Sequence, residues 1–412
     1  MANVSSSNGL EKRPKLRFPG FDEPWKAALL SDYFVKSTKK NSDGMISNVI
    51  CNSAKQGLIP QREYFDKDIA NSDNTNGYYI IESNDFVYNP RKSADAPYGP
   101  ISSYQYPEAG IVSPLYLCFR AKREINPLYF EWYFRSSTWH RYIYMSGDSG
   151  ARHDRVSIKD DVFFAMPINV PSAKEQEKIS LFLDVIERRI ETQRTLVETL
   201  KKYKRGVISV LLSSRNNPYY SSVTWKEVAL CDVASGFEYG MNAAATVYDG
   251  SHKYIRITDI DDNSHLYSQN VPVSPEGQVD EKYRVRENDI LFARTGASVG
   301  KSYRYQRNDG DLYYAGFLIR IHVNSDVNCG YVFQNTLTEA YRRWVLLESA
   351  RSGQPGINAE QYKQYRFLLP PLELQNKIST LATNLDNLIC KEENLLSQIE
   401  QVKIALLQRL FI

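Results

Sequence analysis

The 412-residue chain has only five cysteines, Cys51, Cys118, Cys231, Cys329 and Cys390, and they occur one at a time. It has no CxxC pair, no HExxH motif and no cluster of cysteine with histidine, so nothing in it predicts a structural zinc site. Widely spaced single thiols in a chain of this length fit a reducing cytosol.

Long apolar runs are also missing. No stretch approaches the roughly 18 consecutive apolar residues of a membrane helix. The first residues, MANVSSSNGLEKRPK, are polar and lack the apolar segment of a signal peptide. We therefore expect a soluble, cytoplasmic protein without a membrane partner, in which residues 1–16 form a disordered tail.

The overall composition is that of a globular protein. Hydrophobic residues make up 42% and charged residues 24% of the chain. The length allows two or more domains that each bury a core. A net charge of +3 permits a nucleic-acid partner without requiring one, because an acidic face and a basic face cancel in the sum.

One long segment occurs twice. The segment PSAKEQEKISLFLDVIERRIETQRTLVETLKKYKRGVISVLL (171–212) aligns without a gap with PPLELQNKISTLATNLDNLICKEENLLSQIEQVKIALLQRLF (370–411), at an offset of 199 residues. The offset superposes Gln176 on Gln375 and Lys204 on Lys403. Repeats of this kind govern the architecture, so the chain is expected to be built twice from one unit.

Both copies predict long helices, because apolar residues recur with a heptad period over four to five heptads. The two helices are expected to pair as an antiparallel coiled coil about a pseudo-two-fold axis. Each carries polar residues at the same two seam positions, so Lys204 could lie opposite Glu392 and Lys403 opposite Gln193; alternatively, both lysines reach outward from the edge. The predicted seam comprises Ile179, Leu183, Ile186, Ile190, Val197, Leu200, Lys204, Ile378, Leu385, Ile389, Glu392, Leu396, Ile399 and Lys403.

The segments before the two helices repeat more loosely. Trp25-Lys26 and Trp225-Lys226 open them, and Asn84-Asp85-Phe86-Val87 matches Asn288-Asp289-Ile290-Leu291. Alternating runs such as YYIIESNDFVYN and HKYIRITDI predict strands, and helices are expected at 127–141 and 332–349. The predicted fold is α+β, with two mixed α/β domains on a helical spacer: domains at 17–170 and 213–369, helices at 171–212 and 370–412.

Enzymatic interpretations find little support. The stretch RTGASVGKS (294–302) resembles a phosphate-binding loop, but Gly296 to Gly300 is one residue too short for GxxxxGK[ST]. The following YRYQRNDGDLYY predicts a hairpin turning at 308–310 rather than a helix. The nearest approaches to the Asn-Pro-Pro-aromatic methyltransferase motif, at 89–92 and 217–220, lack the second proline. The 280–282 triplet Asp-Glu-Lys has nuclease-like spacing but is frequent by chance. The chain looks like a binding protein.

The repeated helix openers resemble those of the specificity subunits of type I restriction–modification systems. They read Pro171…Glu175-Gln176-Glu177-Lys178-Ile179 and Pro370-Pro371-Leu372-Glu373-Leu374-Gln375-Asn376-Lys377-Ile378. The start LRFPGFDEPWKAALLSDYF, and DILFARTGASVGKS followed by SGQPGIN, are also similar to that family. Leu374 stands where the family usually has glutamate. The resemblance covers nearly the whole chain.

The resemblance implies a subunit without an active site of its own. Its two target-recognition domains each read half of a bipartite site in double-stranded DNA. The helices act as a spacer that docks two methyltransferase subunits. On this expectation the chain binds no cofactor itself: S-adenosylmethionine, ATP and magnesium belong to partner methyltransferase and restriction/translocase subunits. A different class of function stays open, in which the duplicated module on a coiled coil is a scaffold that binds protein.

The candidate DNA contacts lie in one loop of each domain. In the second domain, glycines allow close approach of the backbone, and basic and hydroxyl side chains suit phosphates or base edges. The alternative is that the glycines merely shape a turn and that Arg294 pairs with a neighbouring carboxylate. The candidates are Arg294, Thr295, Gly296, Ser298, Lys301 and Arg304, with Arg91, Lys92 and Tyr98 in the corresponding first-domain loop, NPRKSADAPYG.

Overall fold

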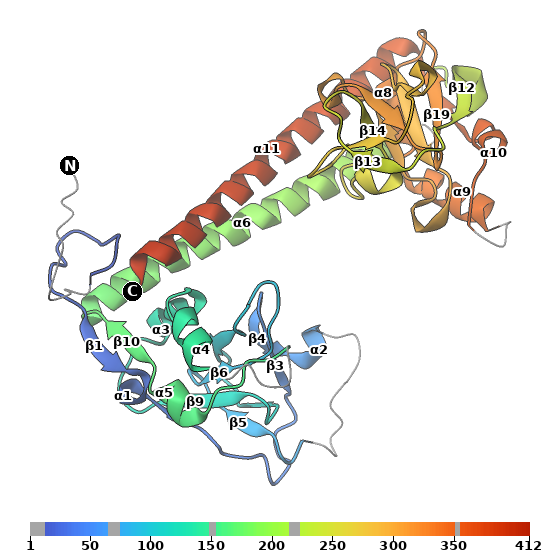
Figure 1. Ribbon diagram of the computed structural model, residues 1–412. Coiled ribbons are helices and arrows are strands. Elements are labelled where there is room, and N and C mark those ends of the chain that lie inside the picture. The colour runs from blue at the N-terminus through green and yellow to red at the C-terminus, as the bar shows by residue number, and fades with distance from the viewer. Residues whose placement is uncertain (1–12, 65–74, 148–153, 214–222, 351–354) are drawn as a thin grey trace. The chain divides into compact units, whose positions relative to one another are not determined.

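A computed structural model describes residues 13–64, 75–147, 154–213, 223–350 and 355–412. The predicted tail up to residue 12, and the 217–220 motif, lie outside the described residues. The chain divides into two compact units. The first comprises residues up to 193 together with 395–412, and the second comprises 194–394. Figure 1 labels their helices and strands.

The first unit is centred on an antiparallel four-stranded sheet, with three two-stranded sheets and short helices around it. In the central sheet the order is β2 (Phe34–Lys36), β9 (Leu117–Ala121), β6 (Phe86–Tyr88), β7 (Ile101–Ser103). The pairs are β1 (Lys26–Leu29) with β10 (Pro167–Val170), β3 (Ile50–Ser53) with β4 (Gly57–Pro60), and β5 (Tyr79–Ile81) with β8 (Gly110–Val112). The short helices are α1 (Leu30–Tyr33), α2 (Gln61–Tyr64), α3 (Pro127–Arg135), α4 (His140–Ser146) and α5 (Asp160–Phe164).

The second unit repeats this plan. Its central sheet has the order β12 (Ala234–Tyr239), β19 (Leu318–Val323), β16 (Asp289–Ala293), β17 (Ser302–Arg304). The pairs are β11 (Lys226–Ala229) with β20 (Arg366–Leu369), β13 (Ala245–Val247) with β15 (Val273–Pro275), and β14 (Lys253–Ile255) with β18 (Leu312–Tyr314). Its helices are α7 (Leu230–Val233), α8 (Cys329–Asn335), α9 (Glu339–Ser349) and α10 (Ala359–Lys363), with 3₁₀ turns η4 (Ile257–Asp259), η5 (Glu281–Tyr283), η6 (Gly296–Ser298) and η7 (Arg307–Asp309).

The matched strand orders confirm the internal repeat. The turn that leads into the central strand, which we call the Asn-Asp turn, is alike in atomic detail. Asn84 and Asn288 both have a left-handed backbone, with φ of 69° and 68°. The following aspartates, Asp85 and Asp289, are buried, and each accepts the backbone amide three residues before it at 2.8 Å. Asparagine tolerates this conformation better than other side chains, which explains the shared Asn-Asp.

Two details of the predicted elements are wrong. Each of the helices expected at 127–141 and 332–349 is two helices. The first is α3 and α4 and the second is α8 and α9, and residues rich in Ser and Thr separate the members of each pair. Ser136 bonds back to the carbonyl of Tyr133 at 2.6 Å, and Thr338 caps α9 through the amide of Tyr341 at 3.2 Å, so hydroxyls replace helical hydrogen bonds at the break.

The hairpin predicted at 308–310 does not form. Those residues close a 3₁₀ turn ending at Gly310, whose φ is +75°. Strand β17 then pairs with β16, whereas β18 pairs with β14 in parallel. All three residues of β18 are buried, so burial in a different sheet outweighs the local turn signal.

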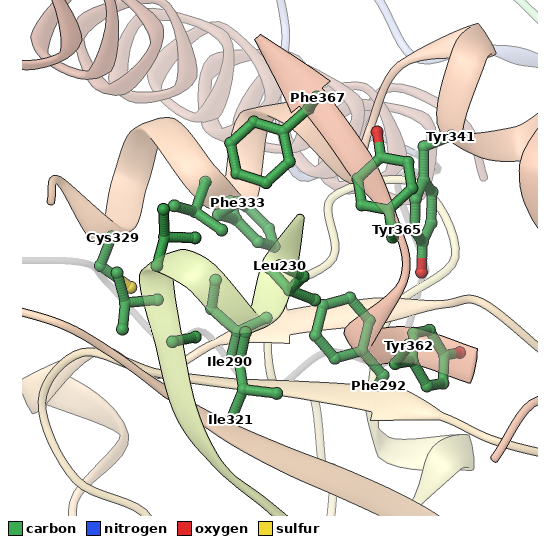
Figure 2. Close-up of a cluster of buried hydrophobic side chains, with 14 of the residues drawn as sticks. Leu230, Ile290, Phe292, Ile321, Cys329, Phe333, Tyr341, Tyr362, Tyr365 and Phe367 are labelled. Atoms are coloured by element: carbon green, nitrogen blue, oxygen red, sulfur yellow. The ribbon is translucent and has the colours of Figure 1, made fainter. Parts of the chain in front are cut away.

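Each unit has an aromatic-rich core. In the second unit the ring of Phe292, on the central strand, packs on Tyr362 of α10 with ring centres 4.8 Å apart (Figure 2). Tyr341 and Tyr365 meet edge to face at 5.0 Å beside them. The core of the first unit is built around Phe34, which contacts several other phenylalanines. The central strands of each unit thus pack into these cores.

The long helices α6 (Ala173–Leu212) and α11 (Leu372–Leu410) are antiparallel in each unit taken by itself. In the first unit, Asn169 just before α6 bonds to Ile412, and Glu187 farther on pairs with Lys403 at 2.8 Å. In the second unit, Lys201 pairs with Glu393 at 2.9 Å and Lys204 with Asp386 at 2.6 Å. The antiparallel coiled coil is therefore confirmed.

The predicted register of its polar residues is wrong. Lys204 pairs with Asp386 instead of Glu392, and Lys403 with Glu187 instead of Gln193. The repeat relates the two observed pairs, since 187 plus 199 is 386 and 204 plus 199 is 403. Each lysine lies on the seam with 16% or 20% of its side chain exposed, and reaches a carboxylate just outside the seam of the other helix. The lysines thus hold one register by ion pairs at the seam's margin.

The other predicted seam residues follow the expected pattern. Every one is buried or partly buried, whereas the positions between them are mostly exposed. Among the described residues, no helix combines the length and the apolar character needed to cross a membrane.

Candidate nucleic-acid interface

The 294–302 loop connects the central strand β16 to the edge strand β17. It contains one 3₁₀ turn, η6, and closes on itself through the amide of Gly300, which donates to the carbonyl of Ala293 at 2.9 Å. A strand follows it, not a helix. The loop therefore lacks the helix N-terminus on which a nucleotide-phosphate loop depends, as the sequence predicted.

The two glycines of this loop have different roles. Gly300 has φ of +85°, and a Cβ there would lie 2.6 Å from the side chain of Val345 on α9. Tyr341, also on α9, donates to its carbonyl at 2.9 Å. Gly300 is thus required by the close approach of a helix. Gly296 has φ of +73° with nothing within 4 Å of a Cβ, so its requirement is the turn conformation and its surroundings are open.

Arg294 is held in place without a carboxylate partner among the described residues. Its guanidinium lies over the ring of Tyr239 at 4.8 Å. Its backbone amide donates to the carbonyl of Phe317 at 3.1 Å, and its carbonyl accepts from Ile357 at 2.9 Å. Stacking on an aromatic ring orders an arginine while leaving donors for a ligand. This geometry favours the contact interpretation for Arg294 over the ion-pair alternative.

Lys301 is engaged inside the domain. Its ammonium donates to the carbonyl of Ile260 at 2.9 Å and pairs with Asp262, and only 11% of its side chain is exposed. Ser298 lines the same small hollow. In this structure Lys301 tethers the 260–262 segment, and its contact with a DNA phosphate stays a prediction.

The other second-domain candidates, Thr295 and Arg304, have contacts within the domain and are both partly accessible. The backbone of Thr295 bridges to Gly356, which joins the 294–302 loop to the 355–358 segment. The guanidinium of Arg304, on β17, lies over the ring of Phe333 at 5.8 Å. Both side chains are at most partly buried. Thr295 and Arg304 therefore stay predictions as DNA contacts.

The corresponding first-domain loop joins β6 to β7. Arg91 and Lys92 are exposed on it, and the amide of Lys92 donates to the carbonyl of Asp154 at 2.8 Å. Tyr98 turns inward: its ring packs against His140 at 4.9 Å and its carbonyl accepts from Tyr88 at 2.8 Å. Arg91 and Lys92 remain available for DNA, whereas Tyr98 supports the loop.

Sequence reasoning missed Tyr239 and Phe317, which lie against Arg294. Both are large aromatic residues with exposed rings. Tyr239 ends a strand and Phe317 follows a glycine, positions that carry no motif. Their importance comes from proximity to Arg294 in the fold, and residue types alone gave no signal for it.

The sequence motifs that resemble enzyme sites have local structural roles in the described residues. No group of three or more histidine, cysteine, aspartate or glutamate side chains could hold a metal ion among them. The nuclease-like 280–282 triplet is a local turn, in which Asp280 caps η5 and pairs with Lys282 at 3.0 Å. Burial raises the pKa of Asp289, but its neighbours, His322 and the amide of Arg286, tie it into the Asn-Asp turn.

Comparison with known proteins agrees with this picture. Residues 222–401 match the family described as the type I restriction modification DNA specificity domain. The chain is 22% identical over 311 residues to the type I restriction enzyme StySPI specificity subunit of Salmonella potsdam. That match covers 71% of this chain and 66% of the relative. Residues 222–401 thus match a type I DNA specificity domain, and the whole chain resembles the specificity subunits of type I restriction–modification systems. Members of this family are generally non-catalytic.

Two solved structures have a fold similar to that of this chain. A chain from a study of the assembly and conformational transition of a type I R-M system matches with a TM-score of 0.61 at 14% identity, covering 96% of this chain and 99% of that one. The S subunit from M. genitalium matches with a TM-score of 0.56 at 13% identity, covering 97% and 99%.

Proposed function

We propose that this specificity subunit reads a bipartite site in double-stranded DNA, one half-site per recognition domain, and carries two methyltransferase subunits on its coiled coil. The observation that supports this most directly is the duplication of one sheet with two different loops. The loops after β6 and β16 leave equivalent strands, yet one presents Arg91 and Lys92 and the other Arg294 on Tyr239. A shared frame with divergent loops suits two different half-sites.

Docking on the coiled coil is supported by a line of exposed or partly exposed apolar side chains outside the seam. On both helices the line has a strict seven-residue spacing, interrupted only by Arg189 and Arg409. The repeat offset of 199 relates three of its pairs, such as Phe182 with Leu381 and Tyr203 with Val402. We call it the apolar stripe: Phe182, Leu196, Tyr203 and Val210 on α6, and Leu381, Leu388, Leu395 and Val402 on α11.

The opposite margin of the seam is charged. There Lys201 pairs with Glu393, Lys204 with Asp386 and Lys403 with Glu187. An isolated two-helix coil needs apolar residues only at its seam. A second apolar line on one side is what further helices would cover. Because the stripe is present in each unit, it fits two copies of one partner.

The partners supply the chemistry in this proposal. The methyltransferase subunits would bring S-adenosylmethionine, and restriction/translocase subunits would bring ATP and magnesium. The chain itself would contribute sequence recognition and placement of the partners on DNA. Its place of action would be the cytoplasm, where these partners and the DNA are found.

Domain exchange tests the reading of two half-sites. The chain, with its second recognition domain (213–369) replaced by that of another specificity subunit, is co-expressed with its methyltransferase subunit, and methylated sites are mapped on genomic DNA. One half of the methylated sequence should change and the other should persist. A change in both halves, or in neither, contradicts modular reading.

Docking has a separate test. Leu381→Asp and Tyr203→Asp should each weaken binding of one methyltransferase copy, giving a complex with one copy in place of two. Leu347→Asp, on a leucine of α9 that is more exposed than either, serves as the control and should leave the stoichiometry unchanged. Two bound copies in all variants, measured by native mass spectrometry, would remove the stripe from the interface. A chain that binds no methyltransferase at all would favour the protein-binding scaffold instead.

A further inference from the structure

One β-turn recurs at the same place in both recognition domains. It precedes β9 in the first and β19 in the second. The amide of Tyr116 donates to the carbonyl of Ser113 at 3.0 Å, and that of Leu318 to Ala315 at 2.8 Å. An offset of 202 residues superposes the first turn on the second, with Ser113 on Ala315 and Tyr116 on Leu318. The turns are therefore structurally equivalent.

Both turns place a large apolar side chain in solvent at their third position. Leu115 is 58% exposed and Phe317 is 61% exposed. Single exposed apolar residues are ordinary on protein surfaces. Turn positions, however, usually carry glycine, asparagine, aspartate or serine, and an apolar tip contributes nothing to the turn's own hydrogen bonds. Its recurrence at one position of a duplicated fold points to a shared function.

The turn tips lie beside the candidate DNA loops. In the second domain, the carbonyl of Phe317 accepts the amide of Arg294 at 3.1 Å, so tip and loop are joined directly. In the first domain, Leu115 and Pro90 line the same hollow, and Pro90 immediately precedes the exposed Arg91 and Lys92. The second tip thus lies against Arg294, and the first shares a hollow with the residue that precedes Arg91 in the chain. That combination complements DNA, with its anionic backbone and apolar base faces.

The second turn is held rigidly. The amide of Gly316 donates to the carbonyl of Met241 at 2.8 Å. A Cβ on Gly240 would lie 2.2 Å from the carbonyl of Ala315, so the two segments are packed backbone to backbone. In the first turn, Ser113 accepts the amide of Leu115 at 3.3 Å. A tip fixed before binding loses little conformational freedom when it enters a groove.

We propose that Leu115 and Phe317 make apolar contacts with bases, one in each half-site of the DNA. The inference rests on the proposed function and adds specificity-determining residues to it. The basic neighbours position the phosphates, and the tip packs on a base. Two kinds of contact share this chemistry: packing on a thymine methyl in the major groove, and insertion of a wedge at a base step in the minor groove. The different side chains, Leu and Phe, suit different half-sites.

The test uses the full chain co-expressed with its methyltransferase subunit. Wild-type methylation, mapped on genomic DNA, first defines the two half-sites. Phe317→Ala and Phe317→Gln should each slow methylation about tenfold, in the range of one lost base contact, and relax sequence preference in the second-domain half-site only. Leu115→Ala should do the same in the other half-site. Phe317→Leu should retain part of the preference, because it remains apolar.

Leu346→Ala is the matched control, since Leu346 is an exposed apolar residue of α9 in the same unit. It should behave as wild type. Duplexes with uracil in place of each thymine, and duplexes with 2-aminopurine at each step, distinguish the two contacts. A methyl contact is lost with uracil in the wild type and not in Phe317→Ala, whereas a wedge raises 2-aminopurine fluorescence only when Phe317 is present.

Three results would overturn the inference: wild-type rates and preferences in Phe317→Ala and Leu115→Ala, equal loss in both half-sites, or loss of bound methyltransferase subunits from the complex. The last would make the tips a protein contact. Failure of the wild-type complex to methylate any bipartite sequence would instead contradict the proposed function, and so the two failures are distinguishable.

Discussion

Each recognition domain has its own central sheet of the same design, and the two domains differ in the residues and small sheets around it. Both have the same central strand order and the same Asn-Asp turn. At that turn the first domain pairs Asp85 with Arg120 through two hydrogen bonds of 2.6 and 2.7 Å, whereas the second pairs Asp289 with His322 at 2.8 Å. The satellite pair β5–β8 is antiparallel, and β14–β18 is parallel. Duplication has kept the backbone frame while the side chains and small sheets around it diverged.

The difference shows which features the frame requires. The buried aspartate is needed in both domains, because its carboxylate accepts a backbone amide in the turn. Its partner on the adjacent strand can be any group that donates to the carboxylate. The loops are constrained where other backbone or side chains approach closely, as at Gly99 beside Asn89 and at Gly300 beside Val345 of α9. Positions such as Gly296, with open space around them, have no such packing constraint.

The largest expected effect comes from those two glycines. Gly99 and Gly300 have φ of +82° and +85°, and a Cβ would lie 2.1 Å from the carbonyl of Asn89 or 2.6 Å from Val345. Alanine at either should destabilise its own unit by about 3 kcal/mol, from backbone strain and overpacking together. Gly296→Ala, with open space around it, should cost only about 1 kcal/mol. Hydrogen exchange of buried amides in each unit measures this separately. Equal costs at Gly296 and Gly300 would contradict the close-approach explanation.

The next effect concerns the aspartate partners. Arg120→Met leaves Asp85 buried without its bidentate partner, and should destabilise the first unit by about 2–3 kcal/mol. His322→Met removes one hydrogen bond from Asp289 and should cost the second unit about 1 kcal/mol. Urea unfolding, monitored by hydrogen exchange of amides in each unit, compares the stability losses of the two variants. If the histidine variant were the more damaging, the two Asn-Asp turns would not be equivalent in the way their geometry suggests.

The pH dependence of the second unit offers a finer test. Burial raises the pKa of Asp289, so the folded state holds its proton more tightly than the unfolded state does. This contribution to stability is therefore fully present below the unfolded pKa of about 4, and is lost as pH rises through the raised pKa. Asp289→Asn should flatten the stability profile of the second unit in that window. An unchanged profile, with the carboxyl resonance titrating at an ordinary pKa, would contradict the expectation.

The smallest effect is at the coiled coil. Double-mutant cycles on Lys204 with Asp386, and on Lys403 with Glu187, should give coupling energies of about 0.5–1 kcal/mol, because the carboxylates are partly exposed. The two values should agree, since the repeat offset converts one pair into the other. A cycle on Lys204 with Glu392 serves as the control and should give no coupling.

The sequence alone determined the features that depend on local pattern. The offset of 199 and the shared heptad phase predicted two matched helices, because burial of a seam imposes a period that can be read directly. The shared Asn-Asp also matched residues 84–87 with 288–291, and both asparagines prove to have a left-handed backbone, which few residues tolerate. The spacing from Gly296 to Gly300 is one residue shorter than in a nucleotide-binding loop. Because the length of such a loop sets its geometry, the sequence argued against nucleotide binding here.

Only the tertiary structure decided which side chains meet. Lys204 pairs with Asp386 and not Glu392, because the heptad pattern alone leaves the axial shift between two antiparallel helices open. Lys301 looked available for DNA and is tethered to the 260–262 segment, whereas Phe317 carried no motif and lies against Arg294. Contacts between residues far apart in the chain depend on packing of whole elements, and no local period encodes them.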